Sequence, residues 1–167
     1  MNQKFTLEFY LNGRSTKAEI LPTMTLLDFL REELGIKSPK YGCGWGSCGA
    51  CTVLVDGNPI LSCLTFAISV DGKHVTTLEG LGNSQNLHLI QKAFLESFAS
   101  QCGFCTPAII LVTKALLDKK PQPTEQDIID SLDGNLCRCT GYLSIISAIK
   151  KSSELLLKQG EKNGRSW

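Results

Sequence analysis

The cysteines of this sequence fall into two groups of four, and their spacing limits the chemistry that the chain can perform. The first group has the spacing C-x4-C-x2-C-x11-C and comprises Cys43, Cys48, Cys51 and Cys63. Its first three positions follow the spacing of plant-type 2Fe–2S sites. The segment YGCGWGSCGAC is also rich in glycine, which permits sharp turns and lets backbone N–H groups point at an anionic cluster.

The fourth cysteine of this group is expected to join the others through a β-hairpin. Gly57 lies midway between Cys51 and Cys63, in the segment VDGNP. Pairing of TVLV with PILS about this turn would place the two cysteines opposite each other, with Cβ atoms about 4.5–5.5 Å apart. A zinc knuckle or buried free thiols are the alternatives, although zinc sites favour separated pairs of cysteines.

The second group has the spacing C-x2-C-x31-C-x-C and comprises Cys102, Cys105, Cys137 and Cys139. Pro121 lies midway between the two pairs, so the sequence predicts an αα-hairpin with arms of about 15–18 Å whose open end unites them. On a helix, Cys137 and Cys139 would point about 200° apart. In an extended segment they share one side and Arg138 points away, so we expect an extended crossing there. A zinc site is the alternative, because C-x2-C is common in zinc proteins.

Hydrophobic periodicity indicates which elements position these cysteines. Strands are predicted over 5–11 and 14–20, joined by an Asn12-Gly13 turn, then a short helix from Thr25 to Gly35 and further strands over 52–55, 59–62 and 74–78. Beyond the break at 80–84, four helices are predicted: about 87–98, from Thr106-Pro107 to Pro121, 124–133 and about 142–158. The fold class is therefore α+β, and four helices with short links suggest a compact bundle.

The division of the chain follows from the same pattern. We expect a first domain over 1–80, a second over 84–160 and a flexible tail over 161–167. Each half has only about 80 residues, a size at which a hydrophobic core alone gives marginal stability. A metal centre in each half would compensate for that weakness.

Composition and charge narrow the function classes. The net charge of +1 over 167 residues gives no reason to expect a nucleic acid or an anionic membrane as partner. The sequence contains no stretch of about 20 apolar residues, and its N-terminus does not resemble a signal peptide. We therefore expect a cytoplasmic protein, in which eight cysteines serve as metal ligands in preference to disulfides.

Three segments carry a resemblance to a known family: GCGWGSCGACTV, QCGFCTP and GNLCRCTGY. In this order and separation, they resemble the iron–sulfur subunit of the molybdenum hydroxylases, the xanthine dehydrogenase and aldehyde oxidoreductase family. The resemblance extends from about Phe5 to Ile149. It implies a β-grasp ferredoxin domain followed by a four-helix domain, each holding one 2Fe–2S cluster.

The resemblance also implies partners and further site residues. Electrons would pass from a molybdopterin cofactor on a large subunit through the two clusters, usually to FAD on a medium subunit. Gln101 would hydrogen-bond the pterin, and Cys139 would contact it while also binding iron; without the resemblance, Gln101 is an exposed or helix-capping residue. Because the sequence ends at Trp167 without a flavin domain, we expect a heterotrimer, single or doubled. The substrate would be a purine, another N-heterocycle or an aldehyde.

A few residues depart from the family pattern or lie outside it. Ala108 stands where relatives often have glycine, which would stiffen the start of its helix. Trp45 is expected to pack over the cluster, to contact a subunit or to shield the cluster from water. Arg138 could raise a cluster potential or form a salt bridge at a surface. His74 and His88 are expected to be surface or packing residues, without the pattern of a Rieske centre.

Two other function classes stay open at the level of sequence. One is a free-standing two-cluster ferredoxin-like carrier, which would be redox-competent as a monomer. The other is a zinc-binding structural module, which would be colourless and free of sulfide. The chain has no nucleophile–base pair and no nucleotide-binding fingerprint, so any substrate chemistry must come from partner chains.

Overall fold

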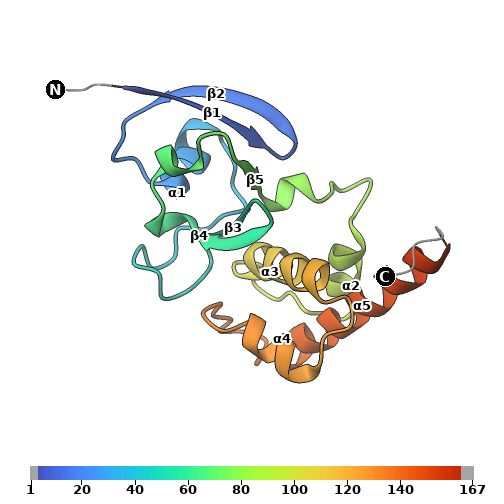
Figure 1. Ribbon diagram of the computed structural model, residues 1–167. Helices are drawn as coiled ribbons and strands as arrows, with labels where there is room; N and C mark the ends of the chain where they lie inside the picture. The colour runs from blue at the N-terminus through green and yellow to red at the C-terminus, as the bar shows by residue number, and fades with distance from the viewer. Residues whose placement is uncertain (1–3, 163–167) are drawn as a thin grey trace.

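The computed structural model describes residues 4–162 and contains a strand-rich part followed by a helical part (Figure 1). The predicted α+β class is therefore correct. The sheet contains five strands in the order β2-β1-β5-β3-β4. Their bounds are β1 Phe5–Leu11, β2 Arg14–Ile20, β3 Thr52–Val55, β4 Asn58–Leu61 and β5 His74–Thr76. β1 and β5 run parallel, and the other neighbouring strands are antiparallel.

Two tight turns set the hairpins of this sheet. The predicted Asn12-Gly13 turn joins β1 to β2, and both of its residues have positive φ, 52° and 79°. Asp56 and Gly57 form the corresponding turn between β3 and β4, with φ of 49° and 77°. Such two-residue turns match the right-handed twist of paired strands. Both hairpins therefore follow from short-range sequence signals.

The register of the β3–β4 hairpin differs by one residue from the prediction. Thr52 pairs with Leu61 and Val55 with Asn58, so the turn centres between Asp56 and Gly57 and not on Gly57. The residue opposite Cys51 is consequently Ser62, whose hydroxyl donates a hydrogen bond to the Cys51 carbonyl at 2.7 Å. The predicted direct opposition of Cys51 and Cys63 is wrong, because a two-residue turn leaves an even number of residues between paired positions.

The first helix is short and changes its winding. α1 spans Leu26–Asp28 and is capped by Thr25, whose hydroxyl accepts a hydrogen bond from the Asp28 N–H. The chain continues as a π-helix over Phe29–Glu33, in which the Leu34 N–H donates to the Phe29 carbonyl. Leu26, Leu27 and Leu30 are fully buried, and Gly35 ends the segment with a φ of 68°.

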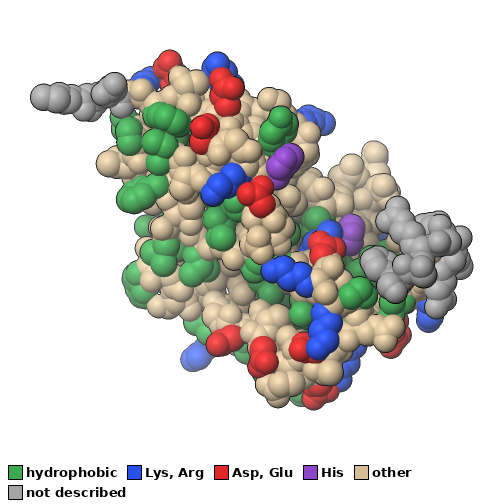
Figure 2. Space-filling view, in the orientation of Figure 1, with side chains coloured by type: hydrophobic (Ala, Val, Ile, Leu, Met, Phe, Trp, Pro, Cys, Tyr) green, Lys and Arg blue, Asp and Glu red, His purple; other side chains and the backbone are tan. Residues whose placement is uncertain are grey.

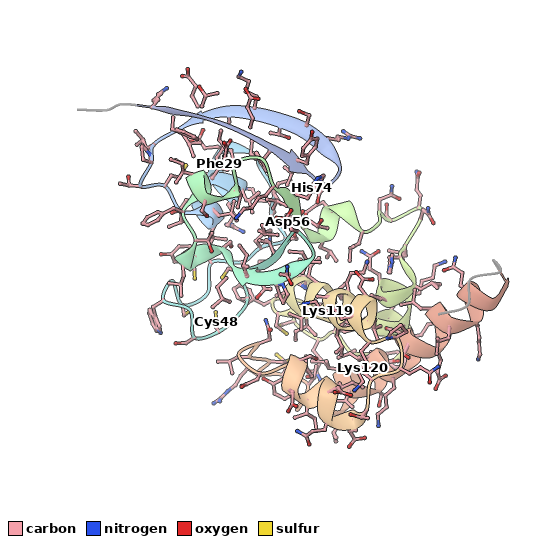
Figure 3. The ribbon with its side chains drawn as sticks, viewed as in Figure 1. Phe29, Cys48, Asp56, His74, Lys119 and Lys120 are labelled. Carbon is pink, nitrogen blue, oxygen red and sulfur yellow. The ribbon has the colours of Figure 1, made fainter. Side chains whose placement is uncertain are left out.

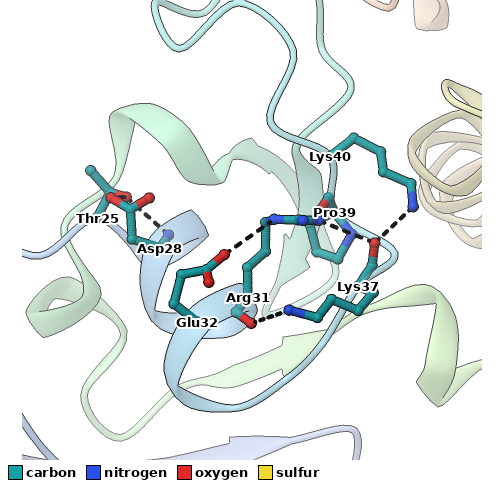
Figure 4. A network of polar contacts seen from close by, with 7 residues as sticks. All are labelled: Thr25, Asp28, Arg31, Glu32, Lys37, Pro39 and Lys40. Carbon is teal, nitrogen blue, oxygen red and sulfur yellow. Dashed lines mark hydrogen bonds and ion pairs between the residues drawn. The ribbon is translucent and has the colours of Figure 1, made fainter.

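A polar network holds the next segment against this helix (Figure 4). The Arg31 guanidinium donates to the carbonyl oxygens of Pro39 at 2.7 Å and Lys37 at 3.3 Å. Lys37 in turn donates from Nζ to the Arg31 carbonyl at 2.8 Å. Since the first cysteine loop begins just beyond Lys40, the network fixes the direction from which the loop starts.

Four α-helices follow the sheet: α2 Leu89–Glu96, α3 Thr106–Lys119, α4 Glu125–Ser131 and α5 Leu143–Lys162. Their apolar sides share a core that includes Ile90, Phe94, Ile109, Ile128 and Ile145. Helix α5 extends to Lys162, two residues into the predicted tail, and residues 163–167 of that tail lie outside the described part of the chain.

The ends of the helices show which local sequence signals predict a helix boundary correctly. The Thr124 and Asp127 capping box begins α4 as predicted. Helix α3 begins one residue earlier than predicted, with Cys105 at the N-cap position and Thr106 inside the helix. The two arms of the αα-hairpin are also unequal, because α4 is half as long as α3. The chain therefore returns to the open end of the hairpin in non-helical form over residues 135–140.

Helix α3 joins the helical part to the sheet, lying beneath β3 and β4 in Figure 1. Leu54 of β3 packs with Leu111 and Ala115 of α3 in a small buried cluster. At the end of the helix, Lys119 donates from Nζ to the side-chain oxygen of Asn58 at 2.9 Å (Figure 3). None of the helices within residues 4–162 combines the length and the apolar character that crossing a bilayer requires.

Candidate metal centres

The first cysteine loop, residues 42–51, has the turns that its glycines predicted. Gly44, Gly46 and Gly49 all have positive φ, between 67° and 85°. A Cβ at Gly42 would lie 2.7 Å from the Cys48 sulfur, so a side chain there would occupy the space beside the thiol. Figure 3 shows Cys48 on this loop, below β4. The absence of a side chain at Gly42 therefore leaves room for the Cys48 thiol.

Two of its thiols, Cys43 and Cys48, form one interacting pair. The backbone N–H of Trp45 donates to the Cys43 sulfur and makes the largest contribution to lowering the pKa of Cys43 to about 6. The N–H groups of Cys48 and Ser47 and the Cys48 thiol act in the same direction. The Ser47 N–H lies 3.3 Å from this sulfur. Because iron binds the thiolate and not the thiol, these donors favour the state that a metal ligand requires.

The other two thiols of the first group, Cys51 and Cys63, form a second pair on the buried side. They pack together with Leu27 in the interior. Burial, together with the neighbouring Cys51 thiol, raises the pKa of Cys63 to about 11. Cys63 reaches Cys51 through the helical turn Ser62–Leu64 that follows β4, in place of the cross-strand position that the hairpin predicted.

The second group is collected at the start of α3 and again forms two pairs. Cys102 interacts with Cys139, and Cys105 interacts with Cys137. Cys102 and Cys139 are exposed, whereas the other two are partly buried. Residues 137–140 are non-helical, as predicted, but residues 138–140 form a bend and not a strand. Cys137 lies beside Cys105, and Cys139 lies beside Cys102.

Electrostatics differ between the members of this group. Burial, together with the thiol of Cys137, raises the pKa of Cys105 to about 12. Burial also acts to raise the pKa of Cys137, but hydrogen bonds from Thr140 outweigh it and lower that pKa. The N–H of Phe104 and the Cys139 thiol lower the pKa of Cys102. The four thiols thus have distinct surroundings, which is a means of tuning a bound cluster.

Each donor set consists of four cysteines, the number of protein ligands that a 2Fe–2S cluster takes. Across residues 4–162, no group of three or more Cys, His, Asp or Glu side chains is arranged to hold a single metal ion. A 2Fe–2S cluster instead takes its four protein ligands as two on each of two irons. Each group of cysteines contains two thiol pairs, so the residues present fit such a cluster in both places.

Backbone and side-chain hydrogen bonds connect the two cysteine groups directly. The Leu136 N–H donates to the Cys48 carbonyl at 3.0 Å. Asn135 is buried and donates from its side-chain amide to the Gly49 carbonyl, also at 3.0 Å. The hydroxyl of Tyr142 donates to the Asn135 carbonyl and accepts from the Cys137 N–H. Sequence reasoning did not identify the contacts between the groups, because these join residues more than eighty positions apart.

The remaining predicted residues lie on the surface or outside the two centres. Gln101 is exposed beside Cys102, where its proposed pterin contact stays a prediction. Trp45 is 71% exposed, so it does not pack into the interior over the first group. His88 caps α2, accepting a hydrogen bond from the Ile90 N–H. The ring of His74 stacks on that of Tyr10 at 4.5 Å.

Arg138 and Ala108 lie near the second group. Arg138 is exposed between its two cysteines. Ala108 is buried in the first turn of α3, so its methyl group faces the interior and not a partner surface. The buried position limits its effect to packing at the start of the helix.

Two family models match successive parts of the chain. A model of the 2Fe-2S iron-sulfur cluster binding domain matches residues 9–76, and a model of the [2Fe-2S] binding domain matches residues 77–150. The nicotinate dehydrogenase small FeS subunit of Eubacterium barkeri is 46% identical over 151 residues, which cover 90% of this chain and 96% of that protein. A probable xanthine dehydrogenase subunit of Bacillus subtilis is 45% identical over 146 residues, covering 87% and 84%.

A solved structure shows the same similarity in three dimensions. The crystal structure of quinoline 2-oxidoreductase from Pseudomonas putida 86 contains a chain that superposes with a TM-score of 0.89 at 38% identity. The superposition covers 93% of the present chain and 98% of the other. Similarity therefore extends over both cysteine groups and over nearly the full length of these relatives.

Proposed function

The chain belongs to the family of iron–sulfur subunits of the molybdenum hydroxylases, and we propose that its eight cysteines hold the two 2Fe–2S clusters through which this electron-transfer subunit works. The observation that carries the proposal is the gathering of each cysteine group into two thiol pairs. When bound, each cluster supplies one-electron oxidation and reduction. The chain positions the clusters, sets their surroundings and holds them close together.

The pairing of thiols indicates which cysteines share an iron. In the first centre, we assign Cys43 and Cys48 to one iron and Cys51 and Cys63 to the other. In the second centre, the pairs are Cys102 with Cys139 and Cys105 with Cys137. The support for this assignment is contact: Cys51 and Cys63 share one buried cluster, and side-chain hydrogen bonds join Cys43 to Cys48, Cys102 to Cys139 and Cys105 to Cys137.

The finer architecture is part of the proposal. We assign residues 1–80 to a β-grasp ferredoxin-type domain and residues 84–160 to a four-helix domain, each with one cluster. The five-stranded sheet with α1, and the shared core of α2 to α5, support this division. The thiol content also supports a reducing compartment, the cytoplasm, as the location.

Exposed apolar side chains beside both centres support binding to partner subunits. Phe98 is 84% exposed and Leu143 is 77% exposed, and they lie close in sequence to the second cysteine group. Around the first group, the exposed apolar residues are Tyr41, Trp45, Leu64 and Phe66. Figure 2 shows hydrophobic side chains gathered along the left edge of the molecule, whereas charged side chains lie over both its upper and its lower part. Such patches mark interaction surfaces.

We propose that the surface at Phe98 and Leu143 binds a molybdopterin-containing large subunit, with Gln101 and Cys139 reaching the pterin. The surface at Trp45 would bind an FAD-containing medium subunit. Together the three chains would form a heterotrimer, single or doubled, that oxidises an N-heterocycle or an aldehyde. The relatives named for nicotinate, xanthine and quinoline favour an N-heterocycle.

Metal analysis of the purified chain tests the central proposal. We expect about four irons and four sulfides per chain and two distinct EPR signals after reduction, as two 2Fe–2S clusters require. Cys51→Ser and Cys105→Ser serve as matched variants, each expected to remove a different one of the two signals. Zinc without sulfide, or loss of the same signal in both variants, would contradict the proposal.

Isolation of the complex from the native source tests the partners. Two larger chains that carry a molybdopterin and FAD are expected to co-purify with this one. Phe98→Ser should weaken retention of the molybdopterin chain, whereas Ile129→Ser, at an exposed apolar position on α4, should leave it unchanged. A fully redox-competent monomer without partners would instead identify a free-standing carrier.

A further inference from the structure

We propose that Asn135 is a positioning residue for electron exchange between the two metal centres, because its side chain holds the peptide contact that joins their cysteine loops. The inference rests on the proposed function, since it requires a cluster in each centre. Neither the family models nor the relatives' names assign a role to this residue. The role follows from five hydrogen bonds at and next to one buried amide.

The contact itself is a single hydrogen bond between two ligand-bearing loops. Cys48 belongs to the first centre, and its carbonyl oxygen accepts from the Leu136 N–H at 3.0 Å. Leu136 is covalently joined to Cys137 of the second centre. A continuous path of bonds therefore runs from one ligand to the other, interrupted only by this hydrogen bond. Electron tunnelling decays less steeply along bonds and hydrogen bonds than across an open gap.

Asn135 holds this peptide from the side of the first loop. Only 7% of the residue is exposed, and its amide nitrogen lies 3.0 Å from the Gly49 carbonyl and 3.4 Å from the Thr52 hydroxyl. Gly49 directly follows Cys48. The Asn135 amide therefore binds the carbonyl group next to the one that accepts from Leu136. A buried amide that has lost these partners would carry a desolvation cost, so the side chain is strongly held in place.

Tyr142 fixes Asn135 from the side of the second loop. The Tyr142 hydroxyl donates to the Asn135 carbonyl at 3.0 Å and accepts from the Cys137 N–H at 2.8 Å. Its backbone adopts a φ of 69°, which is uncommon for a residue with a side chain. Asn135 is thus connected to the second centre through its own carbonyl and to the first through its side chain.

The two parts of the chain are held together elsewhere, so Asn135 is not needed simply to keep them in contact. Leu54 packs against Leu111, and Lys119 donates to Asn58 far from the cysteine loops. By contrast, Leu136 is 59% exposed, and water can compete for its N–H once the neighbouring amide is removed. Loss of the Asn135 side chain is therefore expected to weaken the hydrogen bond between Leu136 and Cys48, here called the bridge, within an otherwise intact fold.

The experiment compares Asn135→Ala and Asn135→Leu with the unaltered chain in its purified complex. Leu nearly keeps the size of the side chain, lacks the N–H donor and adds no charge, and it decides the result if Ala impairs folding. Asn58→Ala is the matched control, because it removes a hydrogen bond between the same two parts away from the clusters. Iron and sulfide content and both midpoint potentials are measured first, and we expect them to be unchanged.

Three measurements then report on the hydrogen bond between Leu136 and Cys48. Deuterium exchange at the Leu136 amide, resolved by mass spectrometry, should accelerate about fivefold or more in both Asn135 variants, since one hydrogen bond contributes about 1 kcal/mol. Electron transfer between the clusters after flash reduction should be measurably slower. The magnetic interaction between the two reduced clusters in EPR should weaken. Asn58→Ala should match the unaltered chain in all three.

Unchanged exchange and unchanged transfer rate in both Asn135 variants would overturn the inference, as would an equal slowing in Asn58→Ala. A shift of either midpoint potential that accounts for the slower transfer would also overturn it, since Asn135 would then act on the clusters and not on the bridge. Failure of the proposed function has a different signature: the unaltered chain itself would lack iron and sulfide.

Discussion

Replacement of Gly49 by alanine is expected to break the contact between the two cysteine loops. Gly49 has a φ of 67°, and a Cβ there would lie 2.3 Å from the Gly134 carbonyl oxygen and 2.4 Å from the Asn135 amide nitrogen. Real Cβ atoms essentially never come this close to other atoms, and one of the two neighbours is backbone. The segment that carries Asn135 and Leu136 must therefore move away from the first loop.

The expected loss of stability has two parts. The left-handed backbone costs a residue with a side chain roughly 1–2 kcal/mol. Displacement of the segment also breaks the hydrogen bonds from Asn135 to Gly49 and from Leu136 to Cys48, which contribute about 1 kcal/mol each. We expect Gly49→Ala to lower the free energy of unfolding by about 3–4 kcal/mol in total.

Gly57→Ala separates these two parts. Gly57 also has a positive φ, 77°, but no atom of residues 4–162 beyond its chain neighbours lies within 4 Å of the position of its Cβ. This variant should therefore show only the backbone cost of roughly 1–2 kcal/mol.

Urea unfolding of the cluster-loaded chain, followed by far-UV circular dichroism, gives the free energies, and visible absorption reports whether the clusters are retained. Equal destabilisation in Gly49→Ala and Gly57→Ala would refute the reasoning, because the crowding at Gly49 would then have no energetic effect.

Three further variants test other parts of the structure. Leu111→Ala should lower the free energy of unfolding by about 2–5 kcal/mol in urea, because it leaves a cavity where α3 packs on β3. Glu79→Gln should destabilise the chain at neutral pH. Burial acts to raise the pKa of Glu79, but hydrogen bonds from two hydroxyl groups and two N–H groups outweigh burial and lower that pKa. The lowered folded-state pKa stabilises the chain above the unfolded value of 4.5, so the difference from the unaltered chain should shrink as urea titrations move below that pH. Thr140→Val removes the hydroxyl 3.0 Å from the Cys137 sulfur, and redox titration should show the second cluster's potential lowered by at most about 40 mV, the equivalent of one hydrogen bond of about 1 kcal/mol.

Much of the architecture could be predicted because its signals are local. Asn12-Gly13 specifies a two-residue hairpin, and Thr124 with Asp127 specifies a helix start, and both are formed. The spacing of the cysteines likewise depends on short loops whose turns are specified by glycine. In each of these cases the residues that determine the structure lie within a few positions of one another.

The features that sequence reasoning missed depend on packing or on distant contacts. The one-residue register shift at β3–β4 follows from the preference for a two-residue turn. Asp56-Gly57 signals such a turn, but the predicted hairpin was centred on Gly57 alone. The shortness of α4 and the return of the chain over 135–140 have no such local signal. The partnership of Asn135 with Gly49 joins residues 86 positions apart, so periodicity and spacing cannot reveal it.

The closeness of the two centres follows from the direction in which one helix packs on one strand. Cys51 directly precedes β3, and Cys105 directly precedes α3. At these starting ends, Phe104 lies 3.6 Å from the position of a Cβ at Gly42, whereas at the other end Lys119 of α3 reaches Asn58 just beyond β3. The strand and the helix therefore run in the same direction.

This shared direction places both cysteine groups at the same end of the molecule. Reversing the helix on the strand would keep every ligand spacing in the sequence but would separate the centres by the length of α3, about 21 Å. The ligand motifs thus determine what each centre can bind. The packing of Leu54 on Leu111 places the two centres close together, so that they can form one path for electrons.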